Sequence, residues 1–378
     1  MILILHCDEL RKGKFRGGNY IMAKPNNINE VTPAVFAENN FPEWGTWLNE
    51  QIANKKVPEG SFAIWWLGCM GTWLKTHEGT NIAIDMWNGT GKHTHGNGKM
   101  RKGHQMMRMT GCESMQPNLR NKPYVIDPFA IRDLDALCVT HTHHDHLDIY
   151  TAACVNKYCP KARFIGPQGV ADEWKAWGVP AEKITVVKPG DEIKVGSVTI
   201  KALEAFDRTE LVTEDDPKVK LAGTKPIEMA RVAVNYLVKT SGGNLYHAGD
   251  SHYSNTFVKH GNENKIDVAL CAYGENPRGV TDKLDDSQVL RMAEALKTKV
   301  IIPMHYDIWT NFYSDPKDII ALWNRKKYRL QYKFKPYVWQ VGGEFNFPQD
   351  KDKFEYMYDR GFHDAFKNKP DLPFPELL

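Results

Sequence analysis

The segment from Thr140 to Asp148 constrains this chain more than any other, because His141, His143, Asp145 and His146 follow one another in H-x-H-x-D-H spacing. The apolar run 137–139 comes directly before it and predicts a buried strand. Imidazoles and carboxylates are ligands of divalent metals. A strand that ends in such a cluster places the donors at a sheet edge, where open coordination positions can face a substrate. The pattern predicts a hydrolytic metal site, with a solvated histidine-rich loop as the alternative.

The bulk composition is that of a globular protein with a large core, since 42% of the 378 residues are hydrophobic and 25% are charged. A formal charge of only +3 argues against broad attraction to nucleic acid or to an anionic membrane. No apolar run is long enough to predict a membrane span. The seven cysteines are scattered and form no C-x-x-C pair, which indicates reduced thiols, most of them buried as small apolar residues.

The chain is expected to divide into a short extension and one domain. Met22 begins a stretch that resembles a second start, so we expect residues 1–40 to be an N-terminal extension that is disordered or that includes a mis-assigned start. Residues 41–378 are expected to form a single hydrolase domain.

Hydrophobic periodicity predicts a hairpin-rich β region followed by mixed β and α structure, twice over. Strands are expected at 62–68, 72–75, 81–85, 164–167, 186–187, 192–195, 198–203, 232–238, 244–247, 268–270 and 300–303. Helices are expected at 42–56, 152–158, 168–177 and 287–296. This order fits the α/β (α+β) class, as a four-layer αββα sandwich, better than a doubly wound parallel sheet.

Two further donors follow predicted strands in the same way. Asp250 comes after the strand 244–247 and a glycine, and His305 comes after the strand 300–303. An aspartate at such a turn is more often a helix cap, so neither residue predicts a ligand alone. Together with the histidine cluster they meet one physical demand, namely that several strand ends converge to build a rigid cage of metal ligands.

This order of motifs, with Asp85 closing an early strand, resembles the metallo-β-lactamase superfamily. Longer segments at 65–69, 127–132, 246–255, 273–279 and 334–343 are similar to the L-ascorbate-6-phosphate lactonases within it, and the similarity runs from about Phe41 to Leu378. The resemblance implies hydrolysis of a small sugar-phosphate lactone, L-ascorbate 6-phosphate, to 3-keto-L-gulonate 6-phosphate. It further implies a cytoplasmic homo-oligomer, with a hexamer expected, and a divalent metal, with manganese expected and zinc or magnesium as alternatives.

One departure from the superfamily pattern concerns a ligand. Most members carry another histidine between the H-x-H-x-D-H cluster and the later aspartate, whereas here no histidine lies between His146 and His247. Asp207 follows a predicted strand at the due place and is the candidate substitute. A carboxylate in place of an imidazole favours manganese or magnesium over zinc. The alternative is that Asp207 pairs with a base such as Arg208 and that the site holds one metal.

The resemblance and the spacing together assign roles to particular residues. Metal ligands are expected at His141, His143, Asp145, His146, Asp207, Asp250 and His305, with Asp145 as the alternative general base. Asp85 and Asp148 are expected to orient histidines. The substrate phosphate is expected at Arg278, with Arg208 and Lys102 as further candidates. The sugar hydroxyls or the leaving oxygen are expected to contact Tyr273, Asn276 and His252.

Two other functions are compatible with the motif. A phosphodiesterase or nuclease of the same fold usually carries an extra domain before the last histidine, and too few residues separate Asp250 from His305 for one. A non-catalytic metal-binding or RNA-binding module would need a closed site of four protein ligands, often cysteines. The motif here is rich in histidine and aspartate and cysteine-free, which argues against such a module. The low formal charge and the lack of a long apolar run predict neither nucleic acid nor a membrane as a partner.

Overall fold

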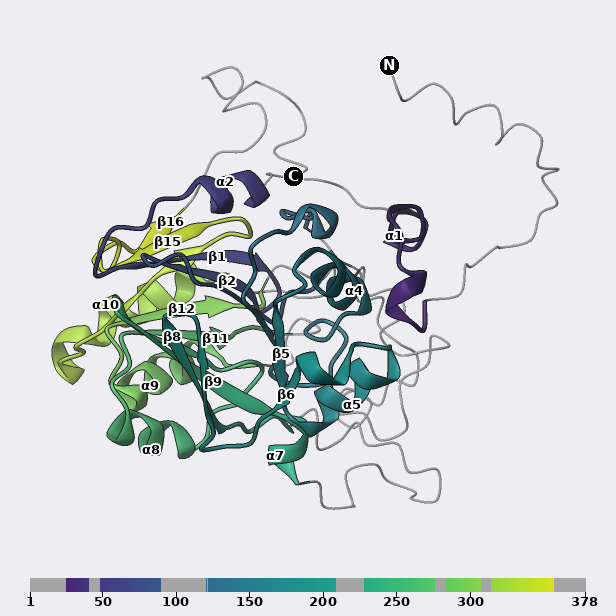
Figure 1. Ribbon diagram of the computed structural model, residues 1–378. Coiled ribbons are helices and arrows are strands. Elements are labelled where there is room, and N and C mark those ends of the chain that lie inside the picture. Colours follow the sequence, from purple (N-terminus) through teal and green to yellow (C-terminus); the bar gives the residue numbers. More distant parts are fainter. Residues whose placement is uncertain are drawn as a thin grey trace, which may run out of the picture.

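The computed structural model describes residues 25–40, 48–89, 120, 122–208, 228–275, 283–306 and 314–356, and Figure 1 shows their arrangement. Two mixed β-sheets pack against each other, and helices lie on the outer faces. The Tyr236 hydroxyl of one sheet donates hydrogen bonds to the carbonyl oxygens of Val139 and Ile165 on the other. The predicted αββα sandwich is confirmed.

The first sheet has the order β15-β1-β2-β3-β4-β5-β6. Pairing is antiparallel from β15 through β1 and β2 to β3, and parallel from β3 through β4 and β5 to β6. Their bounds are β1 Phe62–Gly68, β2 Gly71–Thr76, β3 Asn81–Ile84, β4 Ala136–Cys138, β5 Arg163–Gly166, β6 Ile184–Val186 and β15 Glu344–Phe347. Strand β1 is buried along its whole length, as expected for an unbroken apolar run in a sheet covered on both faces.

The second sheet has the order β13-β12-β11-β10-β9-β8-β7, parallel from β13 to β10 and antiparallel from β10 to β7. Its bounds are β7 Glu192–Val195, β8 Val198–Glu204, β9 Val234–Thr240, β10 Gly243–His247, β11 Val268–Ala272, β12 Val300–Met304 and β13 Lys335–Pro336. A short parallel pair, β14 Val338–Trp339 and β16 Glu355–Tyr356, forms a separate two-stranded sheet. In each sheet the parallel strands end at one edge.

The longer helices cover the sheets from outside. α5 packs on β5 and β6 of the first sheet, whereas α9 packs on β11 and β12 and α10 on β13 of the second sheet (Figure 1). The bounds are α4 Ile149–Tyr158, α5 Gln168–Ala176, α8 Thr256–Glu263, α9 Asp286–Leu296 and α10 Lys317–Leu330. The remaining helices and helical turns are η1 Ile28–Glu30, α1 Pro33–Asn40, α2 Leu48–Asn54, η2 Pro128–Ala130, η3 Ala181–Lys183 and α7 Met229–Val232. None of the described helices is long and apolar enough to cross a membrane.

The N-terminal boundary differs from the sequence expectation. Residues 25–40, assigned above to an extension, form η1 and α1 and pack on the rest of the molecule. Phe36 is buried and makes edge-to-face contacts with the rings of Tyr124, Phe129 and Tyr150. The packed structure therefore begins before the boundary predicted at residue 40, while residues 1–24 lie outside the described part of the chain.

Candidate metal centre

Polar side chains from both sheets meet where strands end. The H-x-H-x-D-H segment follows β4 and leads into α4, while Asp207 follows β8, Asp250 follows β10 and His305 follows β12. The segment after β4 is also tied to the second sheet, because the Val234 amide donates to the Thr140 carbonyl at 2.9 Å. The topology thus brings together donors that are far apart in the sequence.

One group of donors consists of His141, His143, Asp207 and Asp250. The Nε2 atom of His141 lies 2.9 Å from Nδ1 of His143, 3.6 Å from Oδ2 of Asp207 and 3.8 Å from Oδ2 of Asp250. The same Asp207 oxygen lies 3.9 Å from Nδ1 of His143. Asp207, which had been predicted to replace the missing histidine, therefore lies among the first two histidines of the motif.

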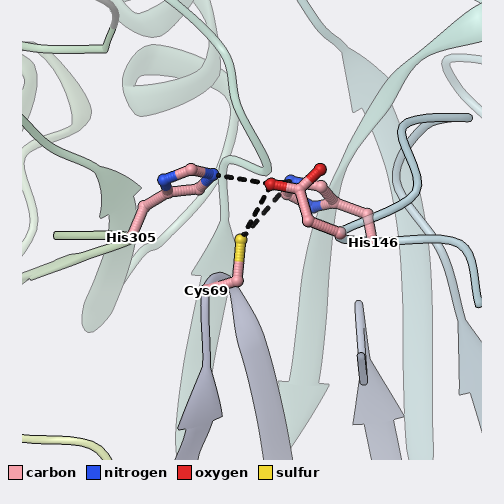
Figure 2. Close-up of side chains that lie close together, drawn as sticks. Cys69, His146 and His305 are labelled. Carbon is pink, nitrogen blue, oxygen red and sulfur yellow. Dashed lines mark hydrogen bonds and ion pairs between the residues drawn. The ribbon is translucent and has the colours of Figure 1, made fainter. Parts of the chain in front are cut away.

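The second group consists of Cys69, Asp145, His146 and His305, and Figure 2 shows the thiol and the two imidazoles pointing toward one another. Oδ2 of Asp145 lies 3.3 Å from Nε2 of His305 and 3.7 Å from Nε2 of His146. The thiol of Cys69 donates to the same Asp145 oxygen at 3.2 Å. All four ligand atoms lie within 4.8 Å of one another, close enough to surround a single ion.

Asp250, a member of the first group, also contacts the second. Its Oδ1 is 3.2 Å from Nε2 of His146, and its Oδ2 is 3.6 Å from Nε2 of His305. Oδ2 also accepts from the buried ammonium group of Lys283 at 2.6 Å. One carboxylate thus contacts histidines of both groups, which is the position that a bridging ligand requires.

Buried residues behind the donors fix the imidazoles. Asp85 accepts at Oδ2 from Nδ1 of His146 at 2.9 Å and from the Thr140 hydroxyl at 2.6 Å. The Thr140 oxygen in turn lies 2.9 Å from Nδ1 of His141. Asp85 therefore has the orienting position that the sequence predicted. Asp148, expected to do the same, caps α4 by accepting from the amides of Tyr150 and Thr151.

The electrostatics of the cage follow from burial and mutual charge. Burial and the neighbouring imidazoles lower the pKa of His141 to about 3, so this ring is neutral at pH 7. Although burial opposes ionisation of Asp207, His141 and His143 lower its pKa to about 2. Although burial opposes the charged imidazole of His305, the acidic groups around it raise its pKa to about 10. Burial likewise opposes ionisation of Asp250, but His146 and Lys283 hold its pKa well below the usual range.

Strained backbone accompanies the site. Cys69, Asp85 and His305 have φ angles of 51°, 51° and 75°, in the left-handed region that residues with a side chain rarely adopt. Such conformations cost about 1–3 kcal/mol each and persist where the surrounding structure imposes them. The fold therefore holds these three side chains at fixed positions around the cage.

The donor set fits divalent metal ions. Imidazole nitrogens and ionised carboxylates are the groups that zinc, manganese and magnesium bind in proteins, and here they form two adjoining groups at the ends of strands. The seven residues predicted as ligands all belong to these groups.

The residues predicted to bind substrate differ in how close they lie to the metal centre. His252 is next to the cage, with Nδ1 3.8 Å from Oδ1 of Asp207, and it accepts there from the Arg208 backbone amide at 3.2 Å. The Arg208 side chain is exposed. The Tyr273 hydroxyl donates to Asp286 at 2.6 Å, on the N-terminal turn of α9. Arg278, Asn276 and Lys102 lie outside the described residues.

Sequence reasoning missed Cys69 and Lys283. The motif had been interpreted as cysteine-free, and this was wrong for the assembled site, because the turn between β1 and β2 brings a thiol into it. The glycines on both sides of that turn, Gly68 and Gly71, indicate a tight turn in the sequence. They do not indicate which residues the Cys69 thiol contacts. Lys283 lies 33 positions from Asp250 in sequence, with no local pattern that pairs them.

Comparison with known proteins gives consistent results. The model of the Beta-lactamase superfamily domain matches residues 63–305. The chain is 56% identical over 352 residues to the probable L-ascorbate-6-phosphate lactonase UlaG of Salmonella heidelberg, covering 93% of this chain and 99% of that protein. The corresponding protein of Salmonella paratyphi B has the same identity and coverage.

Solved structures share the fold at low sequence identity. The isothiocyanate hydrolase from Delia radicum gut bacteria has a TM-score of 0.51 and 18% identity, covering 75% of this chain and 98% of that one. Igni18, a metallo hydrolase from Ignicoccus hospitalis, has a TM-score of 0.50 and 17% identity, covering 76% and 98%. At these identities the likeness concerns the fold alone.

Proposed function

The chain belongs to the β-lactamase superfamily and, within it, to the family of the L-ascorbate-6-phosphate lactonases, and we propose that it hydrolyses the lactone ring of L-ascorbate 6-phosphate to 3-keto-L-gulonate 6-phosphate. The observation that carries this proposal is the pair of adjoining donor groups with Asp250 between them. This arrangement supports two divalent ions, held by His141, His143 and Asp207 on one side and by Asp145, His146 and His305 on the other.

The chemistry of lactone opening fits such a centre. A lactone is a cyclic ester, so its hydrolysis needs a nucleophile at neutral pH and stabilisation of negative charge on the carbonyl oxygen. Bound divalent ions supply both, by lowering the pKa of water from about 16 towards ~7 and by polarising the carbonyl. We assign Asp145 to ligation rather than to general-base catalysis, because its Oδ2 lies 3.3 Å from Nε2 of His305 and 3.7 Å from Nε2 of His146, among the donors of one group.

His252 is our candidate for a group that hydrogen-bonds the leaving oxygen. Because its Nδ1 accepts from the Arg208 amide, the neutral ring carries its proton on Nε2. When water adds to the carbonyl carbon and the ring C–O bond breaks, this N–H can donate a hydrogen bond to the leaving oxygen, while the proton that the oxygen takes up comes from the attacking water. The backbone hydrogen bond fixes the tautomer that this contact requires.

Recognition of the phosphate belongs to the same proposal. Arginine pairs with phosphate through two parallel hydrogen bonds, and the exposed Arg208 follows the cage residue Asp207 directly in sequence. Arg278, Lys102, Asn276 and Tyr273 remain further candidates for contacts with the substrate.

Manganese is the ion that we propose, because Asp207 supplies an oxygen where an imidazole is usual. We also propose that the protein acts in the cytoplasm as a homo-oligomer, with six copies as the expected assembly. Light scattering on the purified protein measures the number of copies directly.

Turnover of two substrates by metal-depleted protein reloaded with manganese or zinc tests the proposal. We expect opening of L-ascorbate 6-phosphate to depend on the added ion and to exceed that of unphosphorylated L-ascorbate. Equal rates on both compounds would contradict phosphate recognition. Absence of ring opening with either ion would contradict the lactonase proposal itself.

A further inference from the structure

The turn between β1 and β2 delivers a thiol to the cage. Cys69 is fully buried, and its sulfur donates to Oδ2 of Asp145 at 3.2 Å and lies 3.9 Å from Nε2 of His146. The other described cysteines, which are Cys138, Cys154, Cys159 and Cys271, are also buried, but none of them belongs to a described donor group. Cys69 therefore stands among metal-binding groups instead of packing as a small apolar residue.

The backbone of the turn is held in place by the cage itself. The Cys69 carbonyl accepts from the backbone amide of His305 at 3.1 Å and from the indole of Trp66 at 2.8 Å. The turn is also tight, because a Cβ at Gly71 would lie 2.8 Å from the Gly68 carbonyl oxygen. The thiol and the imidazole of His305 thus keep a fixed separation, as two ligands of one ion must.

We infer that Cys69 is a metal ligand that makes the two halves of the centre chemically different. The half with Cys69, Asp145, His146 and His305 would bind through sulfur, nitrogen and oxygen, and the half with His141, His143, Asp207 and Asp250 through nitrogen and oxygen only. This inference rests on the proposed function, since both need the cage to hold divalent ions.

The difference between the halves predicts a difference in selectivity. Thiolates favour zinc and similar borderline ions, whereas carboxylates favour manganese and magnesium. The half with Cys69 should therefore take zinc or cobalt(II) in preference to manganese. The half with Asp207, where a carboxylate stands in place of an imidazole, should keep manganese better.

A thiol near an imidazole could instead be a nucleophile that forms a thioester with the lactone carbonyl. Cys69, His146 and Asp85 do follow one another as thiol, imidazole and carboxylate. However, Nε2 of His146 lies closer to Oδ1 of Asp250, at 3.2 Å, than to the sulfur, at 3.9 Å. Four donor atoms that converge within 4.8 Å favour ligation.

Cobalt(II) loading of the full-length protein tests the inference independently of catalysis, because thiolate ligation gives a sulfur-to-cobalt charge-transfer band in the near ultraviolet. We expect this band in the wild type and its loss in Cys69→Ala and Cys69→Ser. Cys154→Ala, which removes a buried thiol on α4, is the matched control and should keep the band. His141→Ala alters the other half and should keep the band as well.

Chelator competition gives a second measurement. Cys69→Ser should lose at least the roughly tenfold in zinc affinity that removal of a supporting group costs, with a much smaller change for manganese. Cobalt bound by the wild type without a thiolate band, or a covalent acyl adduct on Cys69, would overturn the inference and leave the lactonase proposal standing. Failure of the wild type to bind any divalent ion would overturn both.

Discussion

Asp207 is the residue on which the composition of the centre depends. Its Oδ2 lies within 4 Å of both His141 and His143, whereas the neighbouring Arg208 is exposed and donates its backbone amide to His252. This geometry supports ligation over the alternative salt bridge with Arg208. The sequence predicted the position from a missing histidine. It could not choose between the two roles, because both require only a carboxylate after a strand.

Substitution of Asp207 tests this role. Asp207→Ala should lose about one bound ion per chain, because one half of the cage keeps only its imidazoles and the shared Asp250. Asp207→His should restore binding and shift the preference from manganese toward zinc, since the site gains a softer donor. Elemental analysis after dialysis counts the ions, and an unchanged metal content in Asp207→Ala would favour the single-metal alternative.

Lys283 forms a buried ion pair whose contribution to the free energy of unfolding can be measured. It is 5% exposed and lies 2.6 Å from Oδ2 of Asp250, whose side chain is 1% exposed. Lys283→Met should destabilise the metal-free protein by about 1–3 kcal/mol, because Asp250 loses a charged hydrogen-bond partner in a buried site while His146 and His305 still lie beside the carboxylate. Urea unfolding in the presence of a chelator measures the change. A loss below about 1 kcal/mol, typical of an exposed pair, would show that the pair contributes little.

At the scale of elements, hydrophobic periodicity predicted several strands with their bounds, both inside a sheet and at its edge. The expected strand 62–68 coincides with β1, and 192–195 coincides with β7. The helices α8 and α10 and the short strands β13 to β16 were not predicted. In α10 the buried residues Ile319 and Trp323 are four positions apart, a helical spacing that the sequence analysis did not use. The short strands have two to four residues, too few to give a periodic signal, and tertiary contacts rather than local pattern stabilise them.

Gly249, in the turn after β10, packs closely against Thr140 behind the metal donors. Gly249 has φ 49°, and a Cβ there would lie 2.7 Å from the Thr140 hydroxyl oxygen, which contacts both Asp85 and His141. Gly249→Ala should therefore displace Thr140 and weaken metal binding, in addition to about 1–3 kcal/mol of backbone strain.

Gly190→Ala is the matched control for this substitution. Gly190 has φ 100° with open space around its Cβ position, so it should show strain without a change in metal affinity. Metal titrations and urea unfolding of both variants separate the two effects. Equal metal affinity in the two variants would contradict the proposed link between Gly249 and the donors.

At the scale of the whole molecule, the centre lies where the ends of strands from two sheets meet, so the fold and the chemistry share one set of residues. Its charge state couples metal binding to pH. Although burial opposes protonation, Asp250 and Asp145 raise the pKa of His146 well above its usual value, and Cys69 together with the same two carboxylates raises the pKa of His305 to about 10. Both imidazoles are therefore protonated at neutral pH in the metal-free protein.

Metal binding should consequently strengthen as pH rises. Each of these imidazoles must lose its proton to become a ligand, so apparent affinity should increase up to about tenfold per proton and per pH unit, until the pKa of His305 near 10 is passed. His141 adds nothing to this dependence at neutral pH, because its pKa is lowered to about 3. Manganese titrations between about pH 6 and pH 8 measure the slope, and a flat profile would contradict the ion-pair network.

Ring opening of L-ascorbate 6-phosphate by His141→Ala tests the central claim most directly, because His141 contacts both His143 and the carboxylates of its group. The matched control is His77→Ala, since His77 follows β2 and its ring nitrogen lies 3.0 Å from the Val57 carbonyl oxygen. We predict that manganese-loaded wild type and His77→Ala open the lactone and that His141→Ala loses at least a hundredfold in turnover, about 2.7 kcal/mol of transition-state stabilisation. Unchanged turnover in His141→Ala would contradict a metal-dependent lactonase.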